Sequence, residues 1–323
     1  MGRRFAAVTV WLALFLGLVP LGNAVVPDAT KATVSLQTFL MTCQIATLVV
    51  GLSASLLLLK ERRRGLGLHQ TPTVYSLLSA TFAVPLVFAA SSAIAIRIAL
   101  PVLLEELKTK GANASAQNAG AFGKALTQSP LFITLIWGAL LGALGEELFF
   151  RGLFWSTITD LTSRILSRIN SRQTDNPPNS LSPTQTATSP EQSASFKDHL
   201  LRIVFDGGIA TLLSAALFGW MHKDLPGGVG IVRFWSTTCL GFASGVVRQS
   251  TGSVLPCILL HALYNTLVIG TGHKWFFDPK EKQVLEPVPN TLLLLAVIGV
   301  ALIGVLWFVR VLAARRARSM FSL

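Results

Sequence analysis

Two adjacent glutamates, Glu146 and Glu147, interrupt the apolar stretch SPLFITLIWGALLGALGEELFFRGLFW, and Arg151 follows the second by four residues. Ionisable side chains are costly inside a bilayer, so within an apolar segment they mark a functional site or pair with one another. Two later apolar runs are interrupted in the same way: IATLLSAALFGWMH ends at His222, and SVLPCILLHALYNTLVIG contains His261 and Asn265. We therefore expect the three segments to be helices that pack around one polar site.

The composition is that of a helical membrane protein. Hydrophobic residues make up 51% of the 323 residues and charged residues only 13%, against about 25% charged in soluble domains. The net charge of +12 comes from 27 Lys and Arg against 15 Asp and Glu, and the cations cluster beside apolar runs. Membrane topology explains this pattern better than nucleic-acid binding. All three cysteines (Cys43, Cys239 and Cys257) lie in apolar segments, which predicts small core residues rather than disulfides or metal ligands.

Eight apolar runs approach the length of about 20 residues that a transmembrane helix needs. We therefore predict an all-α polytopic membrane protein with about eight transmembrane helices. The predicted helices cover residues 5–21, 36–59, 73–104, 129–157, 200–222, 229–247, 251–270 and 290–313.

Basic residues fall after alternate predicted helices, which predicts that both termini are cytoplasmic. The first helix follows Arg3-Arg4 and resembles a signal sequence. Apart from Gly22-Asn23-Ala24, no small-residue cleavage site follows it, so we interpret it as a retained anchor. The basic clusters are Arg3-Arg4, Lys60 to Arg64, Arg164 to Arg202, Arg248, and Arg310 to Arg318.

The two glutamates are expected to have different roles. Glu147 and Arg151 are four residues apart, so they share a helix face and can form an ion pair. Glu146 points about 100° away around the helix. A carboxylate with no cation of its own in an apolar setting suits general-base work. Glu146 is therefore the candidate base, and Glu147 is its structural partner.

The histidines and the asparagine complete a candidate catalytic set. Asn265 lies one turn after His261 on the same helix face, and His222 comes from another helix. A histidine can orient water or donate to an oxyanion, and an asparagine amide can donate as well. Together with one carboxylate, these groups can hydrolyse a peptide bond without a covalent step. Glu146 and His222 lie at the same level only if the fourth helix continues to about Arg168.

The three motifs together resemble the CPBP family of membrane proteases, the CAAX-processing endoprotease and bacteriocin-processing family. The family pattern is EExxxR, then FxxxH, then HxxxN or HxxxD. The corresponding segments here are Glu146 to Arg151, Phe218 to His222, and His261 to Asn265. The resemblance covers roughly residues 130–270.

The resemblance implies an intramembrane, glutamate-dependent endopeptidase. It implies six site residues: Glu146 as the base, His222 assisting it, His261 and Asn265 stabilising the oxyanion, and Glu147 and Arg151 holding the site together. No HExxH zinc motif is present, and we favour a mechanism with no metal and no other cofactor. A zinc-dependent membrane protease stays an alternative, because two histidines and a glutamate can ligate zinc.

We divide the chain into N-terminal transmembrane helices of no recognised family (1–128), a protease core (129–270), and a C-terminal loop and transmembrane helix (271–323). Within the core, residues 171–199 are rich in Ser, Thr, Pro, Gln and Asn, which predicts a disordered insert. The expected partners are the lipid bilayer and a peptide or membrane-protein substrate, prenylated or not. A non-proteolytic bacteriocin-immunity or scaffold protein on the same fold is one alternative. A transporter is another, disfavoured by the lack of internal repeats.

Overall fold

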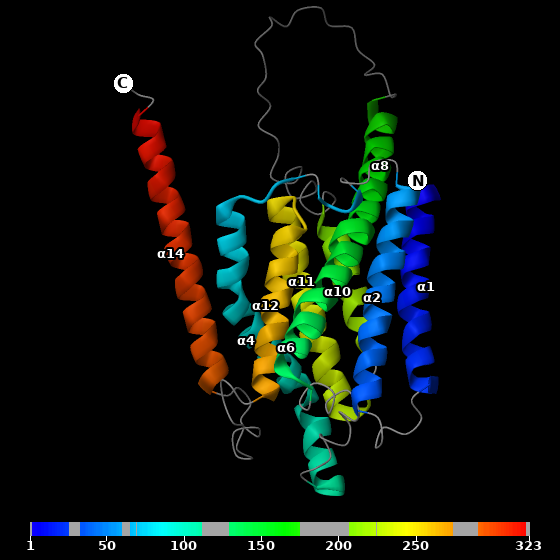
Figure 1. The fold of residues 1–323 in the computed structure, drawn as a ribbon. Coiled ribbons are helices and arrows are strands. Elements are labelled where there is room, and N and C mark those ends of the chain that lie inside the picture. The colour runs from blue at the N-terminus through cyan, green and yellow to red at the C-terminus, as the bar shows by residue number, and fades with distance from the viewer. Residues whose placement is uncertain are drawn as a thin grey trace, which may run out of the picture.

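Every regular element in the described part of the chain is a helix, which agrees with the predicted all-α class (Figure 1). The computed structural model describes residues 2–25, 33–59, 65–68, 70–111, 129–174, 207–223, 225–273 and 290–320. The helices outside the segment that carries the two glutamates are α1 (Gly2–Val25), α2 (Thr33–Leu58), α4 (Val74–Lys110), α10 (Ile209–Met221), α11 (Gly227–Thr251), α12 (Leu255–Gly272) and α14 (Asn290–Met320).

The segment with the two glutamates forms one long helix whose winding changes along its length. It consists of α6 (Leu131–Thr134), η1 (Leu135–Leu141), α7 (Gly142–Glu147), η2 (Leu148–Phe154) and α8 (Trp155–Thr174). The segments η1 and η2 are π-helical, so their turns are wider than those of the α-helical parts. The helix continues well past Trp155. This continuation is the condition under which Glu146 and His222 can lie at the same level. It also includes residues 171–174, the start of the predicted disordered insert, and residues 175–199 lie outside the described residues.

Among the described residues, two helices are long and apolar enough to cross a membrane, judged by length and composition. They are Val74–Lys110, with 37 residues, and Leu131–Arg168, with 38 residues. Shorter apolar helical segments cover Ile45–Leu58, Ile209–Met221, Leu255–Thr271 and Asn290–Leu306. The count of eight transmembrane helices therefore stays a prediction.

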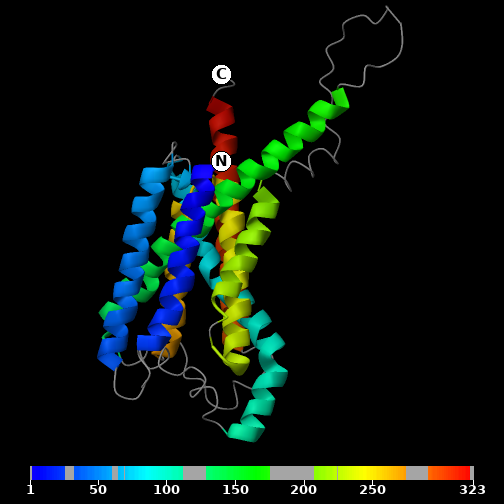
Figure 2. The ribbon, with the colours of Figure 1, turned by 90° about the vertical axis from the view of Figure 1, so that its right-hand side faces the viewer.

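The helices pack side by side as an elongated bundle (Figures 1 and 2). The start of α1 and the end of α14 lie at the same end of the bundle (Figure 1). At that end α8 tilts outward and projects beyond its neighbours (Figure 2). The expectation that both termini are cytoplasmic stays a prediction.

Helix α1 packs directly on the helix that carries the glutamates. The Trp11 side chain is fully buried, and its ring stacks on Phe149 with 5.6 Å between centroids. Its Nε1 donates a 3.0 Å hydrogen bond to Ser55 Oγ on α2. Arg4 forms an ion pair with Asp160 on α8. These contacts make α1 part of the bundle, and its interpretation as a retained anchor stays a prediction.

Helices α10 and α11 approach each other closely through small residues. A Cβ on Gly241 would lie 3.0 Å from Ala215 Cα, and one on Gly245 would lie 2.5 Å from Thr211 Cγ2. Glycines four residues apart allow two helix backbones to come this near, as they do in packed membrane helices. The contact leaves the backbone of α11 within reach of side chains from the long helix.

A tight turn joins α11 to α12 and orients the polar residues that follow it. Gly252 has φ +68°, a left-handed conformation that favours glycine, and its N–H donates to the Arg248 carbonyl. Pro256 then occupies the first turn of α12, where its missing N–H leaves no helical bond unmade. The turn places the end of α11 beside the start of α12, which carries Cys257 and His261.

Candidate active site

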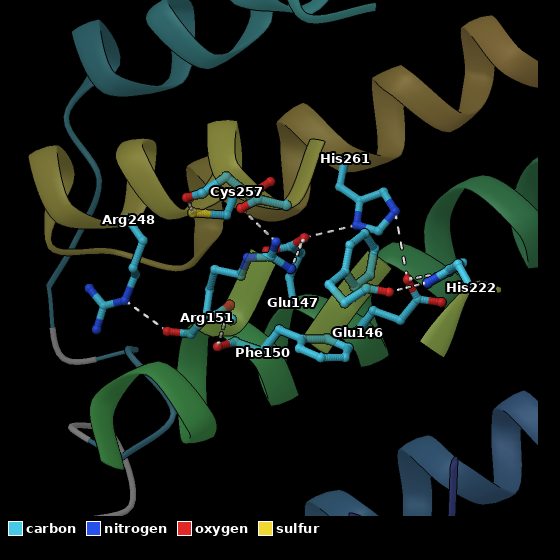
Figure 3. Close-up of polar contacts among 12 residues, drawn as sticks. Glu146, Glu147, Phe150, Arg151, His222, Arg248, Cys257 and His261 are labelled. Carbon is cyan, nitrogen blue, oxygen red and sulfur yellow. Dashed lines mark hydrogen bonds and ion pairs between the residues drawn. The ribbon is translucent and has the colours of Figure 1, made fainter. Parts of the chain in front are cut away.

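A fully buried ion pair lies at the junction of α7 and η2. Arg151 Nη1 donates to Glu147 Oε1 over 3.1 Å, and neither side chain is exposed to solvent. His261 Nδ1 on α12 lies 2.9 Å from the same oxygen (Figure 3). Because a carboxylate only accepts hydrogen bonds, Nδ1 carries the proton. Glu147 therefore pairs with Arg151 one turn away and also fixes the orientation of the His261 ring.

Glu146 faces the two histidines, as Figure 3 shows. Its Oε2 lies 3.7 Å from His222 Nε2 and 3.8 Å from His261 Nε2. His222 Nδ1 lies 2.7 Å from the Phe218 carbonyl oxygen, so it carries a proton and leaves Nε2 toward Glu146. The Glu146 side chain keeps 19% exposure and that of His222 17%, whereas that of His261 keeps 3%. The partly open side of the site is therefore formed by Glu146 and His222.

Arg151 ties the long helix to α11. Its Nη2 donates to the Gly241 carbonyl over 2.8 Å, and its guanidinium lies 4.8 Å from the centre of the Phe218 ring. Phe218 is itself fully buried. A cation over an aromatic face is stabilised by the ring, so Phe218 stabilises the arginine as well as carrying the carbonyl that orients His222.

Residues 128–267 match the family model Rce1-like, described as type II CAAX prenyl endopeptidase Rce1-like. This segment is an Rce1-like domain. The match confirms the family resemblance of the motifs, and it includes all six residues assigned to the site. It covers less than half of the chain and leaves α1, α2, α4 and α14 outside it. No curated protein and no solved structure matches the chain.

Within the Rce1-like domain, Asn265 has a partner away from the glutamates. Its Nδ2 donates to the Gly138 carbonyl in η1 over 3.1 Å. His261 and Asn265 thus lie one turn apart on α12 and bind different parts of the long helix. None of the described contacts joins Asn265 to Glu146 or to either histidine. Its expected role as an oxyanion donor stays a prediction.

Arg248 is a site-supporting residue of the Rce1-like domain that the sequence analysis missed. Its place among the basic clusters indicates only a role in topology, but its side chain is buried, with the residue 3% exposed. Its Nε donates to the Arg151 carbonyl over 3.0 Å, and its guanidinium lies 4.8 Å from the Trp155 ring centre. A Cβ on Gly67 would lie 3.0 Å from the same guanidinium. This role depends on a hydrogen bond from a buried arginine to a distant backbone carbonyl. A single sequence does not show which carbonyl an arginine contacts.

No group of three or more histidine, cysteine, aspartate or glutamate side chains in the described residues forms a candidate metal site. Cys257 is fully buried, and its Sγ lies 3.2 Å from the Ser244 carbonyl oxygen. Cys239 is partly buried, also without a disulfide. Both agree with the expectation of small core residues. Cys43 lies among the residues whose side chains are outside the described set.

Proposed function

We propose that this chain is an intramembrane endopeptidase in which Glu146 activates a water molecule to cleave a peptide bond. One observation carries the proposal. Glu146 Oε2 lies 3.7 Å from His222 Nε2 and 3.8 Å from His261 Nε2, and the three residues come from three separate helical segments. The Rce1-like match supports the same class, because that family consists of CAAX-type membrane proteases.

The first step is proton removal from water. The Nδ1–H of His222 is held by the Phe218 carbonyl, so Nε2 of the neutral ring accepts hydrogen bonds. A water molecule beside Glu146 Oε2 and this Nε2 can donate one hydrogen to each. The carboxylate takes one proton as general base, and the oxygen attacks the carbonyl carbon of the scissile peptide bond. The product of this step is a tetrahedral intermediate with a negatively charged oxygen.

The second step is collapse of that intermediate. His261 donates its Nδ1–H to Glu147, and when the ring also carries a proton on Nε2, this Nε2–H can donate to the oxyanion. The second hydrogen on Asn265 Nδ2 supplies a further donor, the first being bound by the Gly138 carbonyl. Glu146 then returns its proton to the peptide nitrogen as the C–N bond breaks. One product carries a new carboxylic acid and the other a free amine, with no covalent enzyme intermediate.

The proposed substrate is a peptide segment of a membrane-associated protein, prenylated or not, which approaches from the side of Glu146 and His222. We also propose that the chain crosses the membrane several times with both termini in the cytoplasm. The shared end of α1 and α14 and the basic clusters of the sequence support this topology.

The test is cleavage of fluorescently labelled membrane peptides, prenylated and unprenylated, by the purified chain in detergent or lipid. The matched control is Glu146→Ala. We expect cleavage by the natural chain and none by the variant. Equal cleavage by the two proteins would remove Glu146 from the mechanism. Binding without cleavage of any peptide would favour the scaffold alternative.

A further inference from the structure

Three buried polar atoms on the long helix and α11 have no hydrogen-bond partner among the described residues. They are Glu147 Oε2, Arg151 Nε and Ser244 Oγ. All three side chains are fully buried. A buried polar group that makes no hydrogen bond costs about 1–3 kcal/mol, so such groups are almost always satisfied. Two of the three atoms belong to the Glu147–Arg151 pair, and the third lies on α11, whose Gly241 carbonyl accepts from the same arginine.

Two independent series of contacts, one through α11 and one through α12, connect Ser244 with the ion pair. On α11, Ser244 lies one turn after Gly241, whose carbonyl accepts from Arg151 Nη2. Side chains on a helix lean toward its N-terminus, so the Ser244 hydroxyl lies over the Gly241 turn, toward the guanidinium. On α12, Cys257 Sγ lies 3.2 Å from the Ser244 carbonyl, and Cys257 precedes His261 by one turn.

The Cys257 thiol shows that α11 and α12 contact each other at this level of the bundle. Figure 3 draws Cys257 in the same group of side chains as Glu147 and Arg151. The carbonyl that accepts from this thiol is that of Ser244. Ser244 therefore contacts α12 one turn before His261, the histidine that Glu147 binds.

We propose that Ser244 is a positioning residue for Glu147. Its hydroxyl, Glu147 Oε2 and Arg151 Nε–H are joined through one buried water molecule, which needs two to four polar partners and has three here. The water accepts from Arg151 Nε–H, donates to Glu147 Oε2, and bonds the Ser244 hydroxyl. Glu147 is then held at both oxygens, and it holds His261 at the angle that points Nε2 toward Glu146. The positioning role rests on the proposed peptidase chemistry, whereas the network does not.

The test compares Ser244→Ala with Ser214→Ala. Ser214 is also fully buried, but its hydroxyl bonds only the Phe150 carbonyl, over 3.4 Å. The first measurement is the infrared carboxylate stretch of each purified variant minus that of the natural chain, which needs no activity. We expect a shifted carboxylate band for Ser244→Ala and none for Ser214→Ala. An unshifted spectrum for Ser244→Ala would overturn the network.

The second measurement is peptide cleavage by the same proteins. For Ser244→Ala we expect kcat to fall about tenfold with KM unchanged, the size that corresponds to one lost charge-assisted hydrogen bond. Ser214→Ala should keep both values. A band shift with unchanged kcat would reduce Ser244 to a structural residue and overturn its positioning role. If the natural chain cleaves nothing, the peptidase proposal fails and the positioning role fails with it, while the infrared result still decides the network.

Discussion

The two neighbouring glutamates should respond in opposite ways to the same isosteric change. Glu147→Gln removes the negative charge from a pair in which both side chains are fully buried and the N–O distance is 3.1 Å. Breaking a buried pair from one side leaves the other charge uncompensated and costs about 3–5 kcal/mol. Proteins are stable by only about 5–15 kcal/mol in total, so this variant should be close to unfolding.

Glu146→Gln should instead abolish catalysis and leave the fold intact. The side chain is 19% exposed, and its Oε2 lies 3.7 and 3.8 Å from the Nε2 atoms of His222 and His261. Both distances exceed hydrogen-bond length, so the isosteric change breaks no hydrogen bond to either histidine. Chemical denaturation in detergent, followed by circular dichroism, measures the stability of both variants, and cleavage of a labelled peptide measures their activity.

A third variant shows whether the uncompensated charge is the cause. Glu147→Gln combined with Arg151→Met removes both charges, and replacing a whole buried pair by uncharged groups is often neutral or stabilising. The double variant should therefore be more stable than Glu147→Gln alone. Equal stability of Glu147→Gln and Glu146→Gln, or a double variant less stable than the single one, would refute the reasoning.

Three further outcomes follow from the remaining structure and sequence. Trp11→Ala should lower the free energy of unfolding by about 3–5 kcal/mol, because it empties a fully buried site against Phe149, whereas Leu16→Ala, at a 48% exposed position, should change it little. Replacing residues 171–199 by a short Gly/Ser link should preserve cleavage of a small peptide, and loss of activity in a folded variant would reveal a role for the insert. A strong chelator should leave the activity unchanged, and loss that added zinc restores would establish the zinc mechanism instead.

The different neighbours of the two glutamates could be predicted, because helical spacing determines which side chains share a face. Glu147 and Arg151 are four positions apart, and they form the ion pair. The adjacent position turns Glu146 away from that pair and toward His222 and His261. Apolar segments with single polar interruptions leave few other arrangements that bury those groups together.

The contacts that hold the site could not be predicted, because they join side chains to backbone carbonyls of distant segments. Arg248 binds the carbonyl of a residue 97 positions earlier, and Asn265 binds one 127 positions earlier. Both carbonyls lie in the π-helical segments, where the usual i→i+4 ladder is interrupted. No local pattern in the sequence indicates where a helix widens.

These two pinned carbonyls also determine where the chain can change length. Gly138 and Arg151 lie on either side of the glutamates, one in η1 and one in η2. An i→i+5 turn contains roughly one residue more than an i→i+4 turn, so losing one residue inside η1, or inside η2 after Arg151, can be absorbed by returning that segment to ordinary α-helix. Losing one residue inside α7 cannot be absorbed in this way and rotates Glu146 about 100° away from the histidines, and losing one between Glu147 and Arg151 changes the spacing of the ion pair. Related chains should therefore differ in length at η1 and in η2 after Arg151, and not from Gly142 to Arg151.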